Sequence, residues 1–99
     1  IESQACGTPV LAASVGGLRT AVADSVSGVL VDGHDPEQYA RVLGRLHAHP
    51  DVRAELGRGA VDHAVRFGWG MTAAALLRVY SDALCDAAAE VPARVVAGR

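Results

Sequence analysis

Two short apolar runs constrain the fold of this chain more than any other feature. They are Val10–Ala13 and Gly28–Val31. Neither run alternates apolar with polar residues, which is typical of strands covered on both faces in a parallel sheet. A short helical stretch from Leu18 to Ala23 separates them, so we predict one right-handed strand–helix–strand step. The sequence therefore indicates an α/β fold.

The segment before the first run predicts the end of a helix. Gly7 stands where a helix terminates in a left-handed residue, and Pro9 cannot continue the helix. Because α/β sheets bind ligands at one rim, we expect this helix end to lie near that rim. Glu2, about one turn earlier, is then the candidate acid. The chain opens inside this helix without a start or a cap, so we expect a fragment whose N-terminal part is missing.

Three helices are predicted after the second run. Asp35 can cap a helix that begins at Pro36, with Gln38 in the capping-box position, and His49-Pro50 ends that helix. A second helix follows, with apolar residues about one turn apart as far as Phe67.

The third predicted helix runs from about Gly68–Trp69 to about Ala88. Its apolar side chains at helical spacing, Trp69 and Tyr80 among them, are interpreted as core. Val91–Arg99 has no periodicity and is interpreted as a frayed tail. The expected divisions are therefore residues 1–67, 68–90 and 91–99.

Composition excludes several classes of function. Hydrophobic residues make up 51% of the 99 residues and aromatic residues only 4%, which fits an interior of Ala, Val and Leu. The net charge is −2 and the arginines are interleaved with acids, which predicts neither nucleic-acid nor membrane binding. Cys6 and Cys85 lack metal or disulfide spacing, so we interpret them as buried reduced thiols of a cytoplasmic protein.

Three stretches carry a family resemblance: Glu2–Val10, Val15–Leu18 and Asp24–Val31. They resemble the C-terminal domain of retaining glycosyltransferases of the GT-B fold (glycosyltransferase family four). The runs Gln4–Val10 and Val31–Pro36 make the chain most similar to the actinobacterial D-inositol-3-phosphate glycosyltransferases of mycothiol biosynthesis. The resemblance extends to about residue 84.

This resemblance implies a fold and an activity. The fold is the C-terminal part of a Rossmann-like nucleotide-sugar-binding domain, with two short parallel strands followed by three helices. Residues 68–90 would be the long terminal helix that crosses back toward an N-terminal domain. The activity would be transfer of N-acetylglucosamine from UDP-N-acetylglucosamine to 1D-myo-inositol 3-phosphate, so the implied partners are a UDP-sugar and a small phosphorylated acceptor. Homodimer formation stays open.

The resemblance also assigns two site residues. Glu2 would bind the ribose of the donor, since one carboxylate can accept from two neighbouring hydroxyls. Thr8 would contact a magnesium ion. The cations that stabilise the departing diphosphate and the acceptor pocket would lie outside this chain. We therefore assign no catalytic residue here and expect the isolated chain to be inactive.

Simpler readings stay open beside these. On spacing alone Glu2 is a solvated charge, and Thr8 satisfies local backbone groups. Gly16-Gly17 indicates a structural turn more than part of a donor pocket, and the four histidines lack the spacing of a helical metal pair. The alternative functions are another sugar-nucleotide-dependent transferase of the same superfamily, or a non-catalytic packing or assembly module.

Overall fold

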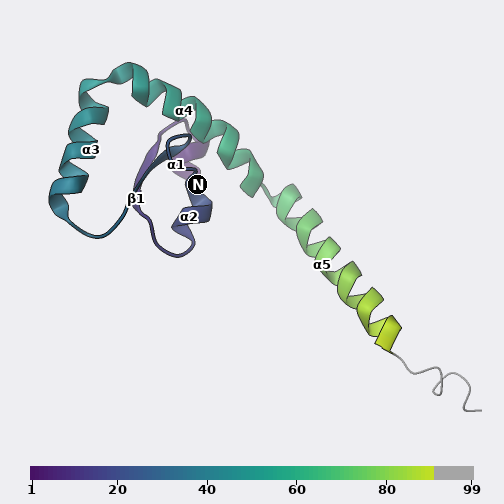
Figure 1. The fold of residues 1–99 in the computed structure, drawn as a ribbon. Coiled ribbons are helices and arrows are strands. Elements are labelled where there is room, and N and C mark those ends of the chain that lie inside the picture. Colours follow the sequence, from purple (N-terminus) through teal and green to yellow (C-terminus); the bar gives the residue numbers. More distant parts are fainter. Residues whose placement is uncertain (91–99) are drawn as a thin grey trace, which may run out of the picture. The chain divides into compact units, whose positions relative to one another are not determined.

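A computed structural model describes residues 1–90 of the chain and shows an α/β architecture (Figure 1). The chain divides into two compact units, Ile1–Phe67 and a second unit that begins at Gly68. The elements in chain order are α1 (Glu2–Ala5), β1 (Val10–Ala13), α2 (Leu18–Ala21), β2 (Gly28–Val31), α3 (Pro36–Ala48), α4 (Pro50–Ala64), a 3₁₀ turn η1 (Val65–Phe67) and α5 (Trp69–Glu90).

The two strands form a parallel pair in which Val10 lies opposite Gly28 and Ala13 opposite Val31. Helix α2 lies between them in the chain, and both strands have the predicted bounds. The predicted α/β class is therefore confirmed. Helix α2 ends two residues before the predicted end, because Val22 turns to an extended conformation (φ −119°, ψ 121°) and is almost fully buried.

The outward edge of β2 is closed by the turn that precedes it. Ser27 and Val31 bond to β1, so Gly28 and Leu30 direct their backbone groups to the other side. There the Ser25 backbone N–H donates to the Gly28 carbonyl at 2.8 Å. The Leu30 N–H donates to Asp24 Oδ1, also at 2.8 Å. The turn thus uses two of the backbone groups that another strand would need for pairing.

The predicted start of α3 is confirmed in its cap. Asp35 Oδ1 accepts a hydrogen bond from the Glu37 N–H at 3.0 Å, and Pro36 occupies the first turn. The reciprocal half of a capping box, a bond from the Asp35 N–H to the Gln38 side chain, is not found in the described structure; Gln38 donates its backbone N–H to the Asp35 carbonyl (3.1 Å). Asp35 therefore acts as a simple N-cap.

The break between α3 and α4 occurs at His49-Pro50, as predicted. Arg53 stabilises it from the first turns of α4. Its Nη1 donates to the Leu46 carbonyl at 2.7 Å and to the His47 carbonyl at 2.9 Å. These carbonyls belong to the last turn of α3, which has no further helix to satisfy them.

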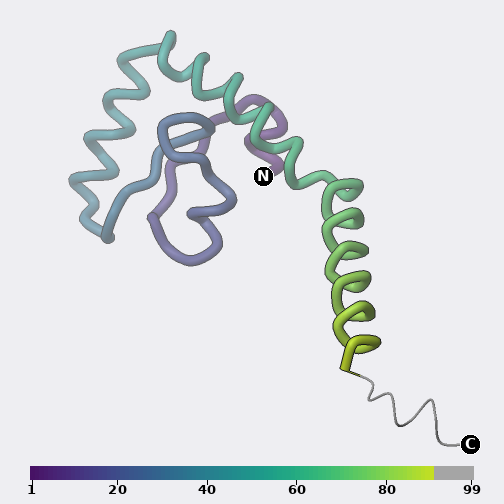
Figure 2. The backbone as a smooth tube through the Cα atoms, turned by 45° about the vertical axis from the view of Figure 1, so that its right-hand side comes forward, coloured from purple at the N-terminus to yellow at the C-terminus, as the bar shows by residue number. Residues whose placement is uncertain are grey.

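Helix α4 packs closely on two turns of the first unit (Figures 1 and 2). Gly57 faces the turn between α1 and β1, where an added Cβ would lie 2.5 Å from the Gly7 carbonyl oxygen. Gly59 faces the turn before β2, where an added Cβ would collide with the Val26 carbonyl oxygen. Glycine at these two positions therefore sets how near α4 can approach the rest of the unit.

The core of the described structure is small. Its buried apolar residues come from the segment before β2, from β2 and from one face of α4: Val22, Val31, Leu56, Ala60 and Ala64. No described helix is long and apolar enough to cross a membrane.

Two predictions about burial are wrong. Trp69 is 89% exposed and Tyr80 is 58% exposed, because α5 belongs to its own unit and none of its residues is buried. Cys6 and Cys85 are free thiols, as expected, but both are exposed. Cys6 is the C-cap of α1 and Cys85 lies on α5, so neither occupies a core position. The tail predicted at 91–99 lies outside the described residues.

Candidate functional site

Glu2 is the first residue of α1, and its side chain is fully exposed. Helix α1 reaches β1 through Cys6–Pro9, so its C-terminal end lies at the amino end of β1. Ligand crevices of parallel sheets lie at the carboxyl ends, and the predicted placement of this helix end at that rim is wrong. The ribose role of Glu2 stays a prediction.

Gln4, two residues after Glu2, is the buried polar residue of this region. Only 1% of it is exposed, and its Nε2 donates to the Ala21 carbonyl at the end of α2 at 2.8 Å. Its Oε1 is also buried and has no hydrogen-bond partner among the described residues. No sequence signal pointed to Gln4, because a glutamine on a helix is ordinarily exposed.

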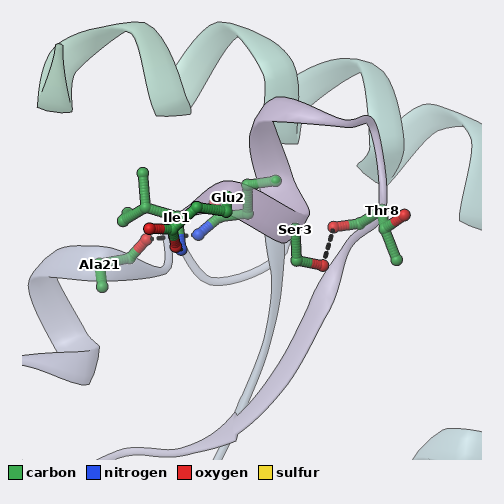
Figure 3. Close-up of polar contacts among 6 residues, drawn as sticks. Ile1, Glu2, Ser3, Thr8 and Ala21 are labelled. Atoms are coloured by element: carbon green, nitrogen blue, oxygen red, sulfur yellow. Dashed lines mark hydrogen bonds and ion pairs between the residues drawn. The ribbon is translucent and has the colours of Figure 1, made fainter.

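Thr8 is held by its backbone and leaves its hydroxyl outside. Its N–H donates to the Ser3 carbonyl at 3.0 Å, and its carbonyl accepts from Ser3 Oγ at 3.2 Å (Figure 3). No hydrogen bond of the Thr8 hydroxyl is found within residues 1–90. The backbone of Thr8 thus closes the turn, and its side chain is exposed.

A hollow of about 370 Å³ lies beside Thr8, with mainly apolar walls and two basic side chains, His47 and Arg53. Magnesium requires about six oxygen ligands, and the Arg53 guanidinium opposes a cation. The described residues also contain no group of three or more acidic, histidine or cysteine side chains suited to a metal ion. Thr8 therefore fits a magnesium ion only as one ligand among others outside residues 1–90.

The loop after β1 is a tight turn. Gly16 has a positive φ of 47°, which glycine adopts without strain, and Gly17 is the N-cap of α2. Arg19 Nε donates to the Ser14 carbonyl at 3.0 Å and closes the loop. These contacts support the structural reading of Gly16-Gly17. The loop nevertheless follows the carboxyl end of β1, on the side where parallel sheets bind ligands.

The histidines do not form a site in the described structure. His34, His47 and His49 are exposed, as expected. His63 is half-buried: its ring packs edge-on against Phe67 at 5.3 Å, and its Nε2 lies 3.2 Å from the Thr20 carbonyl. His63 therefore joins α4 to α2.

Comparison with known proteins gives the class of the chain. Residues 1–63, which contain both strands and the α1 turn, match the family described as "Glycosyl transferases group 1". The match covers more than half of the chain, so the chain belongs to this family. The family and fold predicted from the sequence are confirmed.

Three curated relatives of this chain share one name, D-inositol 3-phosphate glycosyltransferase. The chain is 67% identical over 84 residues to a D-inositol 3-phosphate glycosyltransferase of Thermobispora bispora, covering 85% of this chain and 20% of the relative. It is 63% identical over 86 residues to proteins of the same name from Streptosporangium roseum and Acidothermus cellulolyticus, covering 87% of this chain. The chain spans about a fifth of the length of these relatives: 20% of the Streptosporangium roseum protein and 19% of the Acidothermus cellulolyticus protein. A non-catalytic module gains no support from them.

Proposed function

We propose that this chain is part of the donor-binding domain of a retaining glycosyltransferase. The whole protein would transfer N-acetylglucosamine from UDP-N-acetylglucosamine to 1D-myo-inositol 3-phosphate. Two findings support the proposal: the family match over residues 1–63 and relatives named as D-inositol 3-phosphate glycosyltransferases at 53–67% identity. Groups that stabilise the leaving diphosphate and the acceptor would come from outside residues 1–90.

The proposed role of Glu2 is to bind the ribose of the donor. One observation supports this role: the Glu2 carboxylate is fully exposed on α1, within the residues that match the family. Both oxygens of such a carboxylate can accept hydrogen bonds from neighbouring hydroxyls of one pentose. Glu2 therefore contributes to donor affinity and takes no part in bond making or breaking.

Three further features belong to this proposal. Thr8 supplies one hydroxyl ligand to a magnesium ion whose other ligands lie elsewhere.

Helix α5 docks on an N-terminal domain through exposed apolar side chains. Trp69, Leu77 and Leu84 are suited to this contact, since they are 89%, 68% and 72% exposed. The protein acts in the cytoplasm, and a second copy of the chain is a candidate partner.

Glu2→Ala tests the proposal in the protein expressed from its complete gene. Calorimetry would compare the affinities for UDP and for 2′,3′-dideoxy-UDP, which lacks the ribose hydroxyls. Losing hydrogen bonds to a charged group predicts a loss of roughly tenfold or more for UDP. The dideoxy compound should bind both forms equally. Glu55→Ala, which removes an exposed carboxylate from α4, should change neither affinity. An unchanged UDP affinity in Glu2→Ala would refute the ribose assignment.

A further inference from the structure

We propose that Gln4 is a positioning residue that fixes the rotation of α1 and thereby the direction of the Glu2 carboxylate. The inference rests on the proposed ribose role of Glu2 and assigns the group that orients it. Gln4 itself is buried, so it acts on a nucleoside diphosphate only through Glu2.

The geometry of α1 places the two side chains on opposite sides. An α-helix turns by about 100° per residue, so positions two apart differ by about 200°. Gln4 is accordingly buried, whereas Glu2 is fully exposed. Any contact that holds Gln4 inward therefore holds Glu2 outward.

One directional bond provides this hold. Gln4 Nε2 donates to the Ala21 carbonyl at 2.8 Å and links α1 to the end of α2. The Ser3–Thr8 contacts hold the other end of the turn through 3.2 Å and 3.0 Å bonds. Together they fix α1 both along its axis and around it.

Packing does not account for a glutamine at this position. Gln4 Oε1 is buried without a partner in the described part of the chain, which opposes folding. A methionine has nearly the same volume and would fill the site without the unpaired Oε1, but it would leave the Ala21 carbonyl without this donor. The hydrogen bond to Ala21 is thus what the amide supplies and methionine does not.

Small rotations of α1 matter for a carboxylate at its surface. Helical side chains reach about 5–6 Å from the axis, so a rotation of ~10° moves their tips by about 1 Å. A displacement of this size is enough to break hydrogen bonds to two hydroxyls at once. Loss of the Gln4 bond should therefore weaken the ribose contact selectively.

The test is a double-mutant cycle in the protein expressed from its complete gene. Calorimetry would measure UDP and 2′,3′-dideoxy-UDP affinity for the unmodified protein, Glu2→Ala, Gln4→Met and the double variant. We expect Gln4→Met to weaken UDP binding by about three- to tenfold. Dideoxy-UDP affinity should not change, and Gln4→Met should have no further effect once Glu2 is alanine.

Two controls separate positioning from stability. Asp35→Ala removes the cap of α3, far from α1 in the chain, and should lower stability without changing either affinity. Gln4→Asn keeps an amide that is one methylene too short to reach Ala21. It should reproduce the UDP loss of Gln4→Met, and it replaces that variant if Gln4→Met does not fold.

The outcomes are distinct. Equal losses for UDP and dideoxy-UDP in both Gln4 variants, or a Gln4→Met effect that persists in the Glu2→Ala background, would overturn the positioning role while leaving Glu2 as the ribose ligand. Unchanged UDP affinity in Glu2→Ala would overturn the ribose assignment and the positioning role with it.

Discussion

The close approach of α4 to the α1–β1 turn predicts opposite effects for two glycine-to-alanine substitutions. Gly57 and Gly44 both lie inside helices, so alanine should favour each helix by about 1 kcal/mol. At Gly44 an added Cβ meets nothing within 4 Å, whereas at Gly57 it lies 2.5 Å from the Gly7 carbonyl oxygen. The intrinsic helix term is common to both, so their difference isolates the contact.

The contact at Gly57 has no flexible partner. The opposing atom belongs to the backbone, and Gly7 is itself in the left-handed region at φ 80°. Helix α4 must therefore move away by nearly an ångström to restore ordinary contact. Overpacking of this kind costs about 1–3 kcal/mol, and the free energies of unfolding of the two variants should differ by that amount.

Urea denaturation of the protein expressed from its complete gene would measure this difference. A gap of about 2 kcal/mol shifts the unfolding midpoint by about 1 M if the slope is about 2 kcal/mol per molar. Hydrogen exchange should locate the loss of protection in α4 and the Cys6–Pro9 turn. If Gly57→Ala proves as stabilising as Gly44→Ala, the two backbones do not approach as closely as described.

Two other substitutions follow from local geometry. Ser25 has φ 60°, so Ser25→Gly should stabilise the protein by about 0.5–1 kcal/mol in thermal unfolding, whereas Ser25→Ala should not; equal effects would show that Ser25 is unstrained. Thr8→Val should raise the magnesium concentration needed for half-maximal transfer by about tenfold, and Thr8→Ser should not, because only valine removes the hydroxyl. An unchanged magnesium requirement in Thr8→Val would remove Thr8 from the proposed ligands.

The strands, the start of α3 and the break between α3 and α4 could be predicted because they depend on local chemistry. Both strands are short apolar runs next to glycine or proline, and the Asp35 cap and the His49-Pro50 break act within one turn. The exposure of Trp69 could not be predicted in this way. Helical spacing shows which side chains share a face, but it does not show what covers that face.

The candidate site was predictable only where the family motif carries it. The resemblance pointed to Glu2 and Thr8, and the structure places both at the surface. The burial of Gln4 could not be predicted because it depends on the Ala21 carbonyl, seventeen residues further along the chain. Gly57 could not be predicted for the same reason: its partner is the Gly7 carbonyl, and helix propensity alone makes a glycine in a helix only destabilising.

The turn at Asp24 and Ser25 limits the pairing of a further strand with the outer edge of β2. Ser25 and Asp24 already satisfy the Gly28 carbonyl and the Leu30 N–H, two of the backbone groups that face away from β1. A third strand would therefore have to displace these two bonds in order to pair with β2. Assembly through β2 would first require the Asp24 turn to open.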